Sequence, residues 1–594
     1  MMLQRLFVAL WALSATAHAK ASTQANIIVV LTDDQDNWGS LDYMPLLRKY
    51  IADQGTTFDR HYCTVSICCP SRVNIWTGRA AHNTNVTDLF PPYGGYPVFA
   101  RNGLNENWLP VWLQAEGYRT YYTGKLFNSH TVENFNDPPV NGFNGSDFLL
   151  DPYTYSYWKS KMSRNHAQPV SYHGQYSPDV VANKTYEWLD EAASHDDPFF
   201  IVAAPIAPHS NQDPDVPGVM GLPEYAPRHA HLFKDYKVPR VANFNPDVPS
   251  GVSWVKDLPQ LNETVIEYHD EFQRSRLRAL QSVDEMVEQL VTRLGKHGLL
   301  ENTYIIYTTD NGYHVSQHRL PPGKECPFET DIHIPLIVRG PGIPAGRIAG
   351  VVSSHTDLTP TILKLAGKIR SDLDGAPIPL SQDELTAPES GEHVNVEFWG
   401  RALPEGKYGK IGNDTLRPGS RPVAARNNTY KALRVIGDEY NLLYTVWCTG
   451  EKELYDVHRD PHQVRNLLAQ GKIATPSDYH LAGRSLMDVV SRLDALLLVL
   501  KSCKSRSCHK PWETLHPNSE VTTLKDALRT RYDAFYELQP KVSFSSCPLG
   551  HLISEEGPQT ANVWNGHFMD GELQTPPYGS QKPLQYYGHW SWYT

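Results

Sequence analysis

Excess positive charge, a long apolar run and an internal repeat are all absent from this sequence of 594 residues. Its 54 basic and 65 acidic residues give a formal net charge of −11, which argues against a general nucleic-acid binder. No apolar run is long enough to cross a bilayer, so no membrane span is expected. What is present is a globular composition, 40% hydrophobic and 11% aromatic, in a chain too long for one ordinary core. Two domains are therefore expected.

The N-terminus has the pattern of a secretory signal peptide. Arg5 precedes an apolar run from Leu6 to Leu13, and Ala17-His18-Ala19 provides small residues for cleavage. We therefore expect residues 1–19 to be removed. The predicted destination is the secretory pathway, with the protein secreted or held in the cell wall, the periplasm or a lysosome-like compartment.

The cysteines and the glycosylation sequons fit an exported protein. Most of the eight cysteines should pair in an oxidising compartment, and Cys503 and Cys508 are close enough to close a small loop. Cys68 and Cys69 are adjacent, and adjacent cysteines pair with each other only under strain. Asn-x-Ser/Thr sequons occur at Asn85, Asn144, Asn183, Asn262, Asn413 and Asn427.

Apolar, β-branched runs alternate with helical patterns through most of the chain. The run "ANIIVVLTDDQ" at 25–35 is typical of a strand buried on both faces of a parallel sheet. The amphipathic pattern at 275–299 predicts a helix. This alternation predicts an α/β fold with a mostly parallel central sheet flanked by helices. Further buried strands are predicted within 118–125, 198–209, 303–314 and 334–342.

The pattern changes near residue 385. Short alternating runs broken by turn residues in 421–468 predict a small antiparallel sheet, and 480–503 predicts a helix. We therefore divide the mature chain into a catalytic domain, residues 20–385, and a smaller C-terminal subdomain, residues 386–594.

Polar residues stand where the predicted strands end, and open α/β sheets bind ligands at the carboxyl ends of their strands. One crevice is therefore expected to gather Asp33, Asp34, Lys125, His209, Asp310 and Asn311. The carboxylates and the amide offer only oxygen ligands, which suits Ca²⁺ or Mg²⁺, whereas zinc would require His or Cys. Each also has a plain structural interpretation, because Asp caps helices and Asp-Asn-Gly forms turns.

A second set of residues is basic and would suit a tetrahedral oxyanion ester. Arginine matches such an anion through its planar fork, and amines supply further positive charge. Taken singly, a solvated surface charge or a buried core histidine explains each of them. The set acquires meaning only if the fold gathers Arg72, Lys125, His209, His314 and Lys324.

The segment "SICCPSRVNIWTGR" at 66–79 leaves three interpretations of Cys68 open. The first is a thiolate nucleophile beside Arg72, although cysteine phosphatases place five residues between the two and this chain places three. The second is a structural disulfide. The third is a cysteine marked for chemical conversion, which no spacing argument selects.

The same segment resembles the sulfatase signature, Cys-x-Pro-Ser-Arg followed four residues later by Leu-Thr-Gly, with Trp76 in the Leu position. In that family the first cysteine is oxidised to formylglycine (3-oxoalanine), which is hydrated to a geminal diol. The resemblance implies that Cys68 is the modified residue and that Cys69 fills the variable position. It also implies a formylglycine-generating enzyme as a partner during maturation.

The resemblance runs from residue 26 to about residue 470 and implies an alkaline-phosphatase-like fold. "NIIVVLTDDQ", "TGKLFN", "APH" and "TDNGYHVSQHRLPPGKE" are similar to the family's active-site segments. The double cysteine, "TGK-x-x-N" and "DNGYH" look closest to the branch of fungal and algal arylsulfatases and glucosamine-6-sulfatases. The implied metal ligands, for Ca²⁺ or for Mg²⁺, are Asp33, Asp34, modified Cys68, Asp310 and Asn311. The implied catalytic residues are Cys68, Arg72, Lys125, His209 and Lys324.

The mechanism implied by the resemblance begins with attack of one diol oxygen on sulfur. Lys125, Lys324 and the cation stabilise the sulfate oxygens, and His209 or Lys324 protonates the leaving alcohol; the second hydroxyl then expels sulfate. The chain departs from many arylsulfatases at Phe127, where they have His, and Asn128 follows. The proton acceptor in sulfate release is therefore open, with His314 a candidate by position.

The expected function is that of a secreted arylsulfatase acting on a small-molecule or carbohydrate sulfate ester. A glucosamine-6-sulfatase is the first alternative, and a phosphodiester or phosphonate hydrolase is the second. A catalytically inactive protein that binds sulfate esters is the third.

Overall fold

The computed structural model describes residues 24–37, 39–216, 218–387, 391–408, 425–469 and 479–566. The predicted signal peptide, residues 1–19, and the sequon at Asn413 lie outside these ranges. Within them, every helix is too short or too polar to cross a membrane.

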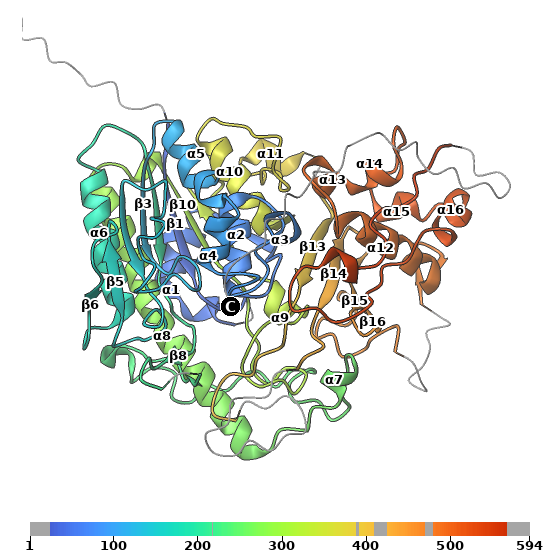
Figure 1. Cartoon of the computed structure of the whole chain (residues 1–594), viewed down its shortest axis with the longest axis horizontal. Coiled ribbons are helices and arrows are strands. Elements are labelled where there is room, and N and C mark those ends of the chain that lie inside the picture. The colour runs from blue at the N-terminus through green and yellow to red at the C-terminus, as the bar shows by residue number, and fades with distance from the viewer. Residues whose placement is uncertain are drawn as a thin grey trace, which may run out of the picture.

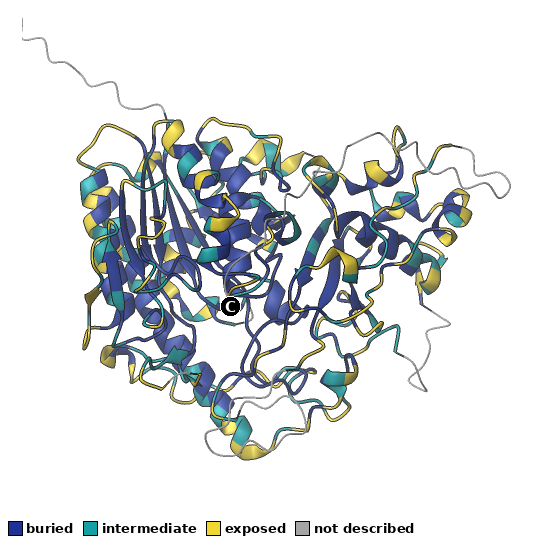
Figure 2. Ribbon diagram, viewed as in Figure 1, coloured by how far each residue is buried: buried dark blue, intermediate teal, exposed yellow. Residues whose placement is uncertain are grey.

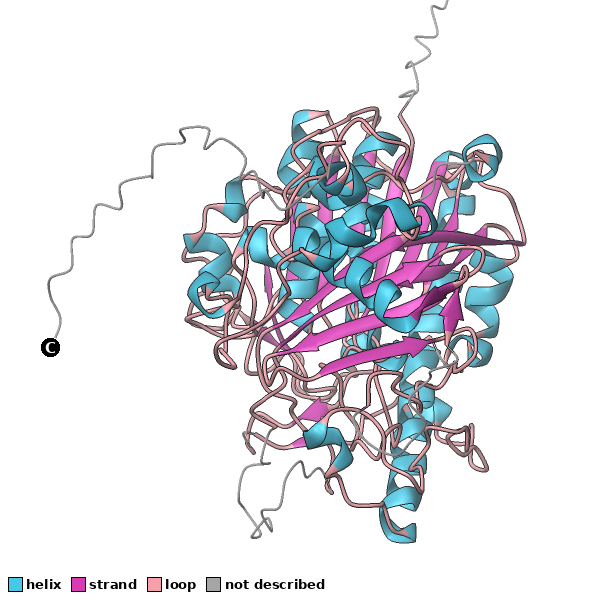
Figure 3. Cartoon of the chain, turned by 90° about the vertical axis from the view of Figure 1, so that its right-hand side faces the viewer, coloured by secondary structure: helices cyan, strands magenta, loops and turns pink. Residues whose placement is uncertain are grey.

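A ten-stranded sheet forms the centre of the larger part of the molecule (Figure 3). Its order is β12-β2-β11-β10-β1-β7-β3-β4-β5-β6, and the five strands from β10 to β4 run parallel. Antiparallel pairings lie toward both edges, so the predicted mostly parallel sheet is confirmed for its centre. The strands span Asn26–Thr32 (β1), Thr56–Tyr62 (β2), Arg119–Gly124 (β3), Gly145–Leu149 (β4), Lys161–Arg164 (β5), Val170–Ser171 (β6), Phe199–Ala204 (β7), Thr303–Thr309 (β10), Leu336–Arg339 (β11) and Arg347–Ser354 (β12).

Strand β1 explains why this sheet is covered on both faces. Successive side chains of a strand point to opposite faces. Ile27 and Val29 therefore enter one apolar core, while Ile28 and Val30 enter another. A strand that is apolar at every position needs helices on both sides, which is the arrangement of parallel sheets.

Helices supply that cover. α2 (Cys68–Thr77), α5 (Leu109–Ala115) and α10 (Leu358–Leu365) contribute to the first core, and α6 (Ser177–Ala192) and α8 (Glu263–Lys296) to the second. The buried strands and the exposed outer helix faces are distinct in Figure 2. α8 begins before the predicted residue 275, because Asn262 caps it by accepting a hydrogen bond from Val265 N at 3.1 Å.

A four-stranded antiparallel sheet lies in the C-terminal region, on the right in Figure 1. Its strands are β13 (His393–Phe398), β14 (Tyr430–Ile436), β15 (Asn441–Trp447) and β16 (Lys452–Asp456). The helix α12 (Leu486–Leu500) packs against it, within the predicted 480–503. The sheet lies within the predicted C-terminal subdomain; the division at 385 and 386 stays a prediction.

The remaining elements are short. The helices are α1 (Pro45–Leu47), α3 (Ala81–Thr84), α4 (Tyr96–Arg101), α7 (Ser253–Lys256), α9 (Glu329–Ile332), α11 (Gln382–Thr386), α13 (Arg506–His509), α14 (Pro511–Leu515), α15 (Leu524–Ala527) and α16 (Asp533–Glu537). Two small hairpins pair β8 (Asn211–Gln212) with β9 (Met220–Gly221) and β17 (His480–Leu481) with β18 (Arg484–Ser485).

Four of the eight cysteines form disulfides. Cys503 pairs with Cys508, as predicted, and Cys448 pairs with Cys547. The expectation that most would pair is wrong, because Cys63, Cys68, Cys69 and Cys326 are free thiols buried in the interior.

A buried ionic network joins helix α3 to the C-terminal sheet. The Glu397 carboxylate on β13 lies 2.9 Å from His82 Nδ1 on α3 and accepts a hydrogen bond from Lys431 Nζ at 2.9 Å. Burial alone would raise the pKa of Glu397, but His82 and Lys431 outweigh it and hold that pKa well below its ordinary value. The network therefore stabilises the fold only while Glu397 is ionised.

Glu397→Gln is expected to lower the free energy of unfolding at pH 7 by about 3 kcal/mol, because it removes the nearer of two carboxylates that balance buried Lys431 and leaves Glu556, 3.4 Å from Lys431 Nζ. Because the folded-state pKa is depressed, this contribution is present above the ordinary pKa of 4.5 and is lost as the pH falls below it. Urea unfolding at pH 7 and pH 4 should show the difference from wild type shrinking with acid. Glu439→Gln, at an exposed position on the β14–β15 turn, is the control, and an equal loss there would contradict the network's role.

Candidate active site

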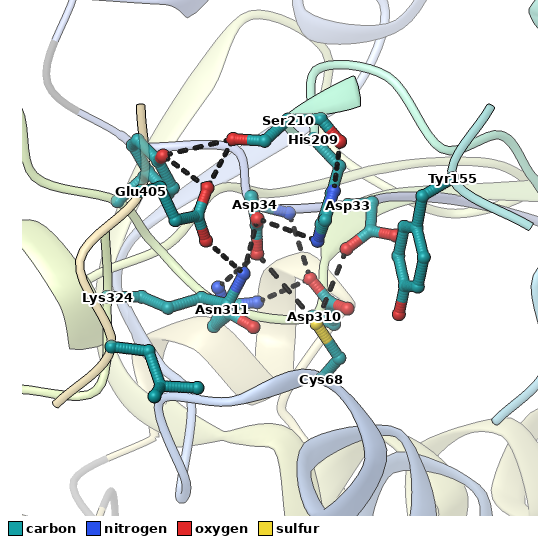
Figure 4. A network of polar contacts seen from close by, with 12 residues as sticks. Asp33, Asp34, Cys68, Tyr155, His209, Ser210, Asp310, Asn311, Lys324 and Glu405 are labelled. Atoms are coloured by element: carbon teal, nitrogen blue, oxygen red, sulfur yellow. Dashed lines mark hydrogen bonds and ion pairs between the residues drawn. The ribbon is translucent and has the colours of Figure 1, made fainter. Parts of the chain in front are cut away.

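The carboxyl ends of β1, β3, β7 and β10 meet at one place, where the predicted polar residues lie together (Figure 4). Asp34 N donates a hydrogen bond to Asp310 Oδ1 at 3.0 Å, and Asn311 Nδ2 donates to Asp34 Oδ1 at 2.8 Å. Asp34 has a positive φ of 64°, a strained conformation that turns its carboxylate into the cluster. The carboxyl ends of these strands thus bring together side chains separated by up to 277 positions.

The helix α2 presents Cys68 and Arg72 to this cluster. The two residues are four apart and therefore lie on the same face of the helix, with Cys68 in its first turn. Arg72 Nε donates to Asp310 Oδ2 at 2.8 Å, and Arg72 Nη1 donates to the Lys125 carbonyl oxygen at 2.7 Å. Exposed backbone N–H groups at a helix N-terminus favour anions, so Cys68 stands at a position suited to an oxyanion.

Two lysines reach the cluster from opposite sides. Lys125 Nζ donates to Asp33 Oδ2 at 2.6 Å, and Lys324 Nζ donates to Asp34 Oδ2 at 2.5 Å. Gly124 allows the turn into Lys125, because its φ is +108° and a side chain there would meet the Ala204 carbonyl oxygen. Burial lowers the pKa of each lysine, but the neighbouring carboxylates outweigh it, so both ammonium groups stay charged.

The state of Cys68 separates its three interpretations. Its Sγ lies 3.6 Å from Asp33 Oδ1 and forms no disulfide, which excludes the structural bridge. Burial raises the pKa of the Cys68 thiol well above its ordinary value, although Lys125 and Lys324 act in the opposite direction. A thiolate nucleophile is therefore disfavoured, and the conversion of Cys68 stays a prediction.

His209 faces the same cluster. Its Nδ1 lies 2.7 Å from the Ser210 carbonyl oxygen, and its Nε2 lies 3.5 Å from Asp34 Oδ2. Because a carbonyl oxygen only accepts, Nδ1 carries the hydrogen of this contact and Nε2 is the nitrogen that faces Asp34. Tyr155 stacks on the ring, with the two centroids 4.2 Å apart. These contacts fix the orientation of the His209 ring toward the carboxylate cluster.

His314 contacts Asp331 rather than the carboxylate cluster, and its role as a proton acceptor stays a prediction. Its Nδ1 lies 2.8 Å from Asp331 Oδ1, while Tyr313 beside it donates to Glu405 Oε2 at 2.6 Å. The rings of Tyr313 and His314 are stacked, with their centroids 6.3 Å apart. Phe127 is likewise in the apolar core, with its ring centroid 4.6 Å from that of Phe99.

A cavity of about 790 Å³ opens above Cys68, His209 and Lys324. Sequence reasoning missed one of its residues, Glu405, whose carboxylate lies 3.3 Å from Lys324 Nζ and accepts a hydrogen bond from Ser210 Oγ. Glu405 lies on the loop after β13, outside every strand-end pattern. No local sequence signal marks it.

The residues present fit a hard divalent cation. Ligand atoms of Asp33, Asp34, Cys68 and His209 all lie within 4.8 Å of one another. Asp310 and Asn311 adjoin this group through Asp34, and Asn311 Oδ1 is buried without a hydrogen-bond partner in the described part of the chain. Carboxylate oxygens and an orphaned amide oxygen form the donor set that Ca²⁺ or Mg²⁺ prefers.

The strand ends of this α/β sheet gather carboxylates, two lysines and an arginine around one cysteine. This arrangement indicates an enzyme that acts on anionic esters. A family model described as Sulfatase matches residues 25–368, and the chain belongs to the sulfatase family. It is 36% identical over 580 residues to an arylsulfatase of Volvox carteri, covering 92% of this chain and 85% of the relative. It is 31% identical to an N-acetylglucosamine-6-sulfatase of Capra hircus, covering 84% and 87%.

Solved structures agree on the fold. One, described as bound to its substrate D-glucosamine-2-N,6-O-disulfate, has a TM-score of 0.59 at 21% identity, covering 75% of this chain and 94% of that one. A phosphonate monoester hydrolase of Silicibacter pomeroyi has a TM-score of 0.51 at 19% identity, covering 75% and 91%. At these identities the likeness establishes the alkaline-phosphatase-like architecture alone.

Proposed function

We propose that this protein is a sulfuric-ester hydrolase, an arylsulfatase, that releases sulfate and an alcohol or phenol. The observation that carries the proposal is Cys68 at the N-terminus of α2, free and facing Asp33, with Arg72 one turn further along. The curated relatives of 36% and 35% identity, from Volvox carteri and Chlamydomonas reinhardtii, are both arylsulfatases.

In the proposed mechanism Cys68 would be the residue converted to formylglycine, and the converted side chain would supply the hydroxyl for attack on sulfur. Lys125 and Lys324 bind the sulfate oxygens and stabilise their charge in the transition state. His209 Nε2 donates a proton to the leaving oxygen, and its fixed Nδ1 bond orients the ring for that transfer. Arg72 orients residue 68 and balances the Asp310 carboxylate.

The bound cation is proposed to be Ca²⁺, with Mg²⁺ as the alternative. Asp33, Asp34, Asp310, Asn311 and converted Cys68 would hold it. Bound there, the cation would neutralise charge on the sulfate oxygens.

Export is part of the proposal. Residues 1–19 would serve as a signal peptide, and a formylglycine-generating enzyme would act on Cys68 during maturation. The sequon asparagines Asn85, Asn144, Asn183, Asn262 and Asn427 are all exposed, as glycan attachment requires.

Hydrolysis of three esters by the secreted protein tests the function. We expect 4-nitrophenyl sulfate to be hydrolysed with kcat/KM of about 10⁴ M⁻¹ s⁻¹ or more. A preference for N-acetylglucosamine 6-sulfate would move the assignment to the sugar-sulfatase alternative, and a preference for bis(4-nitrophenyl) phosphate to the phosphodiesterase alternative. If protein with an aldehyde at position 68 binds these esters but hydrolyses none of them, the result would favour the third alternative, an inactive protein that binds sulfate esters.

A further inference from the structure

The pocket above Cys68 is lined by basic and acidic side chains together. Lys324 and His209 line it, as do the acidic residues Asp151, Glu325 and Glu405, and the one further lysine among its described lining residues is the exposed Lys407. Burial raises the pKa of Asp151 and that of Glu325, so Glu405 is the acidic residue of the wall whose charge its neighbours hold. A sulfate ester that places its sulfate at Cys68 extends its leaving group into this pocket.

Glu405 is held as a charged group in the pocket wall beside Lys324. It is 3% exposed, and Ser210 Oγ donates to its Oε2 (Figure 4), as does Tyr313 Oη. Burial would raise the pKa of Glu405, but Lys324 outweighs it and lowers that pKa to about 2. The carboxylate is therefore ionised at neutral pH.

Lys324 is shared between two carboxylates in addition to the sulfate that it is proposed to bind. Its Nζ contacts Asp34 Oδ2 at 2.5 Å and Glu405 Oε1 at 3.3 Å. A further negative charge on the leaving group would therefore meet Glu405, and the one other lysine among the described lining residues is the exposed Lys407. In a partly buried site such repulsion is weakly screened.

The wall of this pocket also offers hydrogen-bond acceptors. Asn128 Oδ1 is buried in the pocket wall and has no partner among the described residues, while its Nδ2 donates to Tyr155 Oη at 2.6 Å. Glu325 has a positive φ of 82°, and its Oε2 accepts from Leu403 N. An orphaned acceptor beside carboxylates suits a ligand that donates hydrogen bonds.

We propose, resting on the sulfate-ester hydrolysis proposed above, that Glu405 selects against a second negative charge on the leaving group. The natural substrate is then a monosulfate whose leaving group donates hydrogen bonds through hydroxyl or ammonium groups, with Asn128 Oδ1 as one acceptor. Glu405 is the specificity-determining residue of the pocket, because it is the lining carboxylate in contact with Lys324.

The test uses three aryl sulfates that differ only in a para substituent: aminomethyl, which is cationic, hydroxymethyl, which is neutral, and carboxymethyl, which is anionic. We expect kcat/KM to fall about tenfold from the cationic to the anionic ester. In Glu405→Gln the three values should converge to within about threefold, because a neutral amide removes the repulsion. Intrinsic differences between the esters cancel when the two proteins are compared.

A structural role for Glu405, such as holding Lys324, would lower all three rates equally and leave their ratio unchanged. That result would overturn the inference. Asp438→Asn, which removes one exposed charge from the β14–β15 turn, is the control and should keep the wild-type order.

Binding separates this inference from the proposed function. Calorimetric affinities of the three esters for Cys68→Ala protein should follow the same order without turnover. If wild-type protein hydrolyses none of the three esters, the proposed function fails, and the order of their affinities still tests whether Glu405 selects against negative charge. Equal affinities for the three esters would overturn this selection.

Discussion

Cys68→Ala is expected to lower kcat/KM for 4-nitrophenyl sulfate by about 10⁴-fold or more, because it removes the group that attacks sulfur. Cys68→Ser should be equally unable to turn over, since a serine has one hydroxyl and lacks the second one that expels sulfate. Initial rates on purified secreted protein measure both effects. Activity within tenfold of wild type in either variant would contradict the proposed role of Cys68.

Cys69→Ala is the matched control for this prediction. Cys69 is the next residue of α2, yet its side chain lies in the apolar core. We expect it to retain most of the activity and to lose some stability, as small core deletions do.

The mass of the tryptic peptide His61–Arg72, after reduction and alkylation, shows whether position 68 is converted. Alkylation of Cys63 and Cys69 together with an aldehyde at position 68 would support the mechanism. Three alkylated cysteines would mean that the signature is present but unused in that preparation.

Asp34→Asn is expected to weaken binding of the divalent cation by about 100-fold or more. Loss of groups that only support a metal ligand already costs 10–100-fold, and Asp34 is proposed as a direct ligand. The substitution also leaves Lys324 without its closest carboxylate. Metal content of the dialysed protein by mass spectrometry should fall from about one equivalent to near zero, with loss of hydrolysis.

Asp42→Asn serves as the control, because Asp42 is an exposed carboxylate eight positions along the chain. It should keep the full metal content. Thermal unfolding of both variants, with and without added Ca²⁺, separates loss of the ion from loss of the fold. A full metal content in folded Asp34→Asn protein would remove Asp34 from the ligand set.

Much of the site could be predicted from the sequence because its residues stand at strand ends. The buried run that becomes β1 ends at Asp33 and Asp34, and β3 ends just before Lys125. The signature around Cys68 can also be recognised in the sequence, because Cys68 and Arg72 lie one turn apart on the same helix. Residues within one element keep a fixed spacing, so the pattern alone places them.

Other features depended on contacts that no local pattern records. The antiparallel direction of β11, the Cys448–Cys547 disulfide across 99 positions and the place of Glu405 beside Lys324 are of this kind. His314 shows the limit most directly, because position favoured it while the packing turned it toward Asp331.

The sequence by itself determined the α/β class, the sulfatase signature and the candidate ligands, because these follow from residue type and short spacing. The tertiary structure alone decided that Cys448 pairs with Cys547, which histidine faces the site and which carboxylate of the pocket wall contacts Lys324. The reason is physical: a side chain's chemistry belongs to its residue, whereas its neighbours are set by the packing of distant elements.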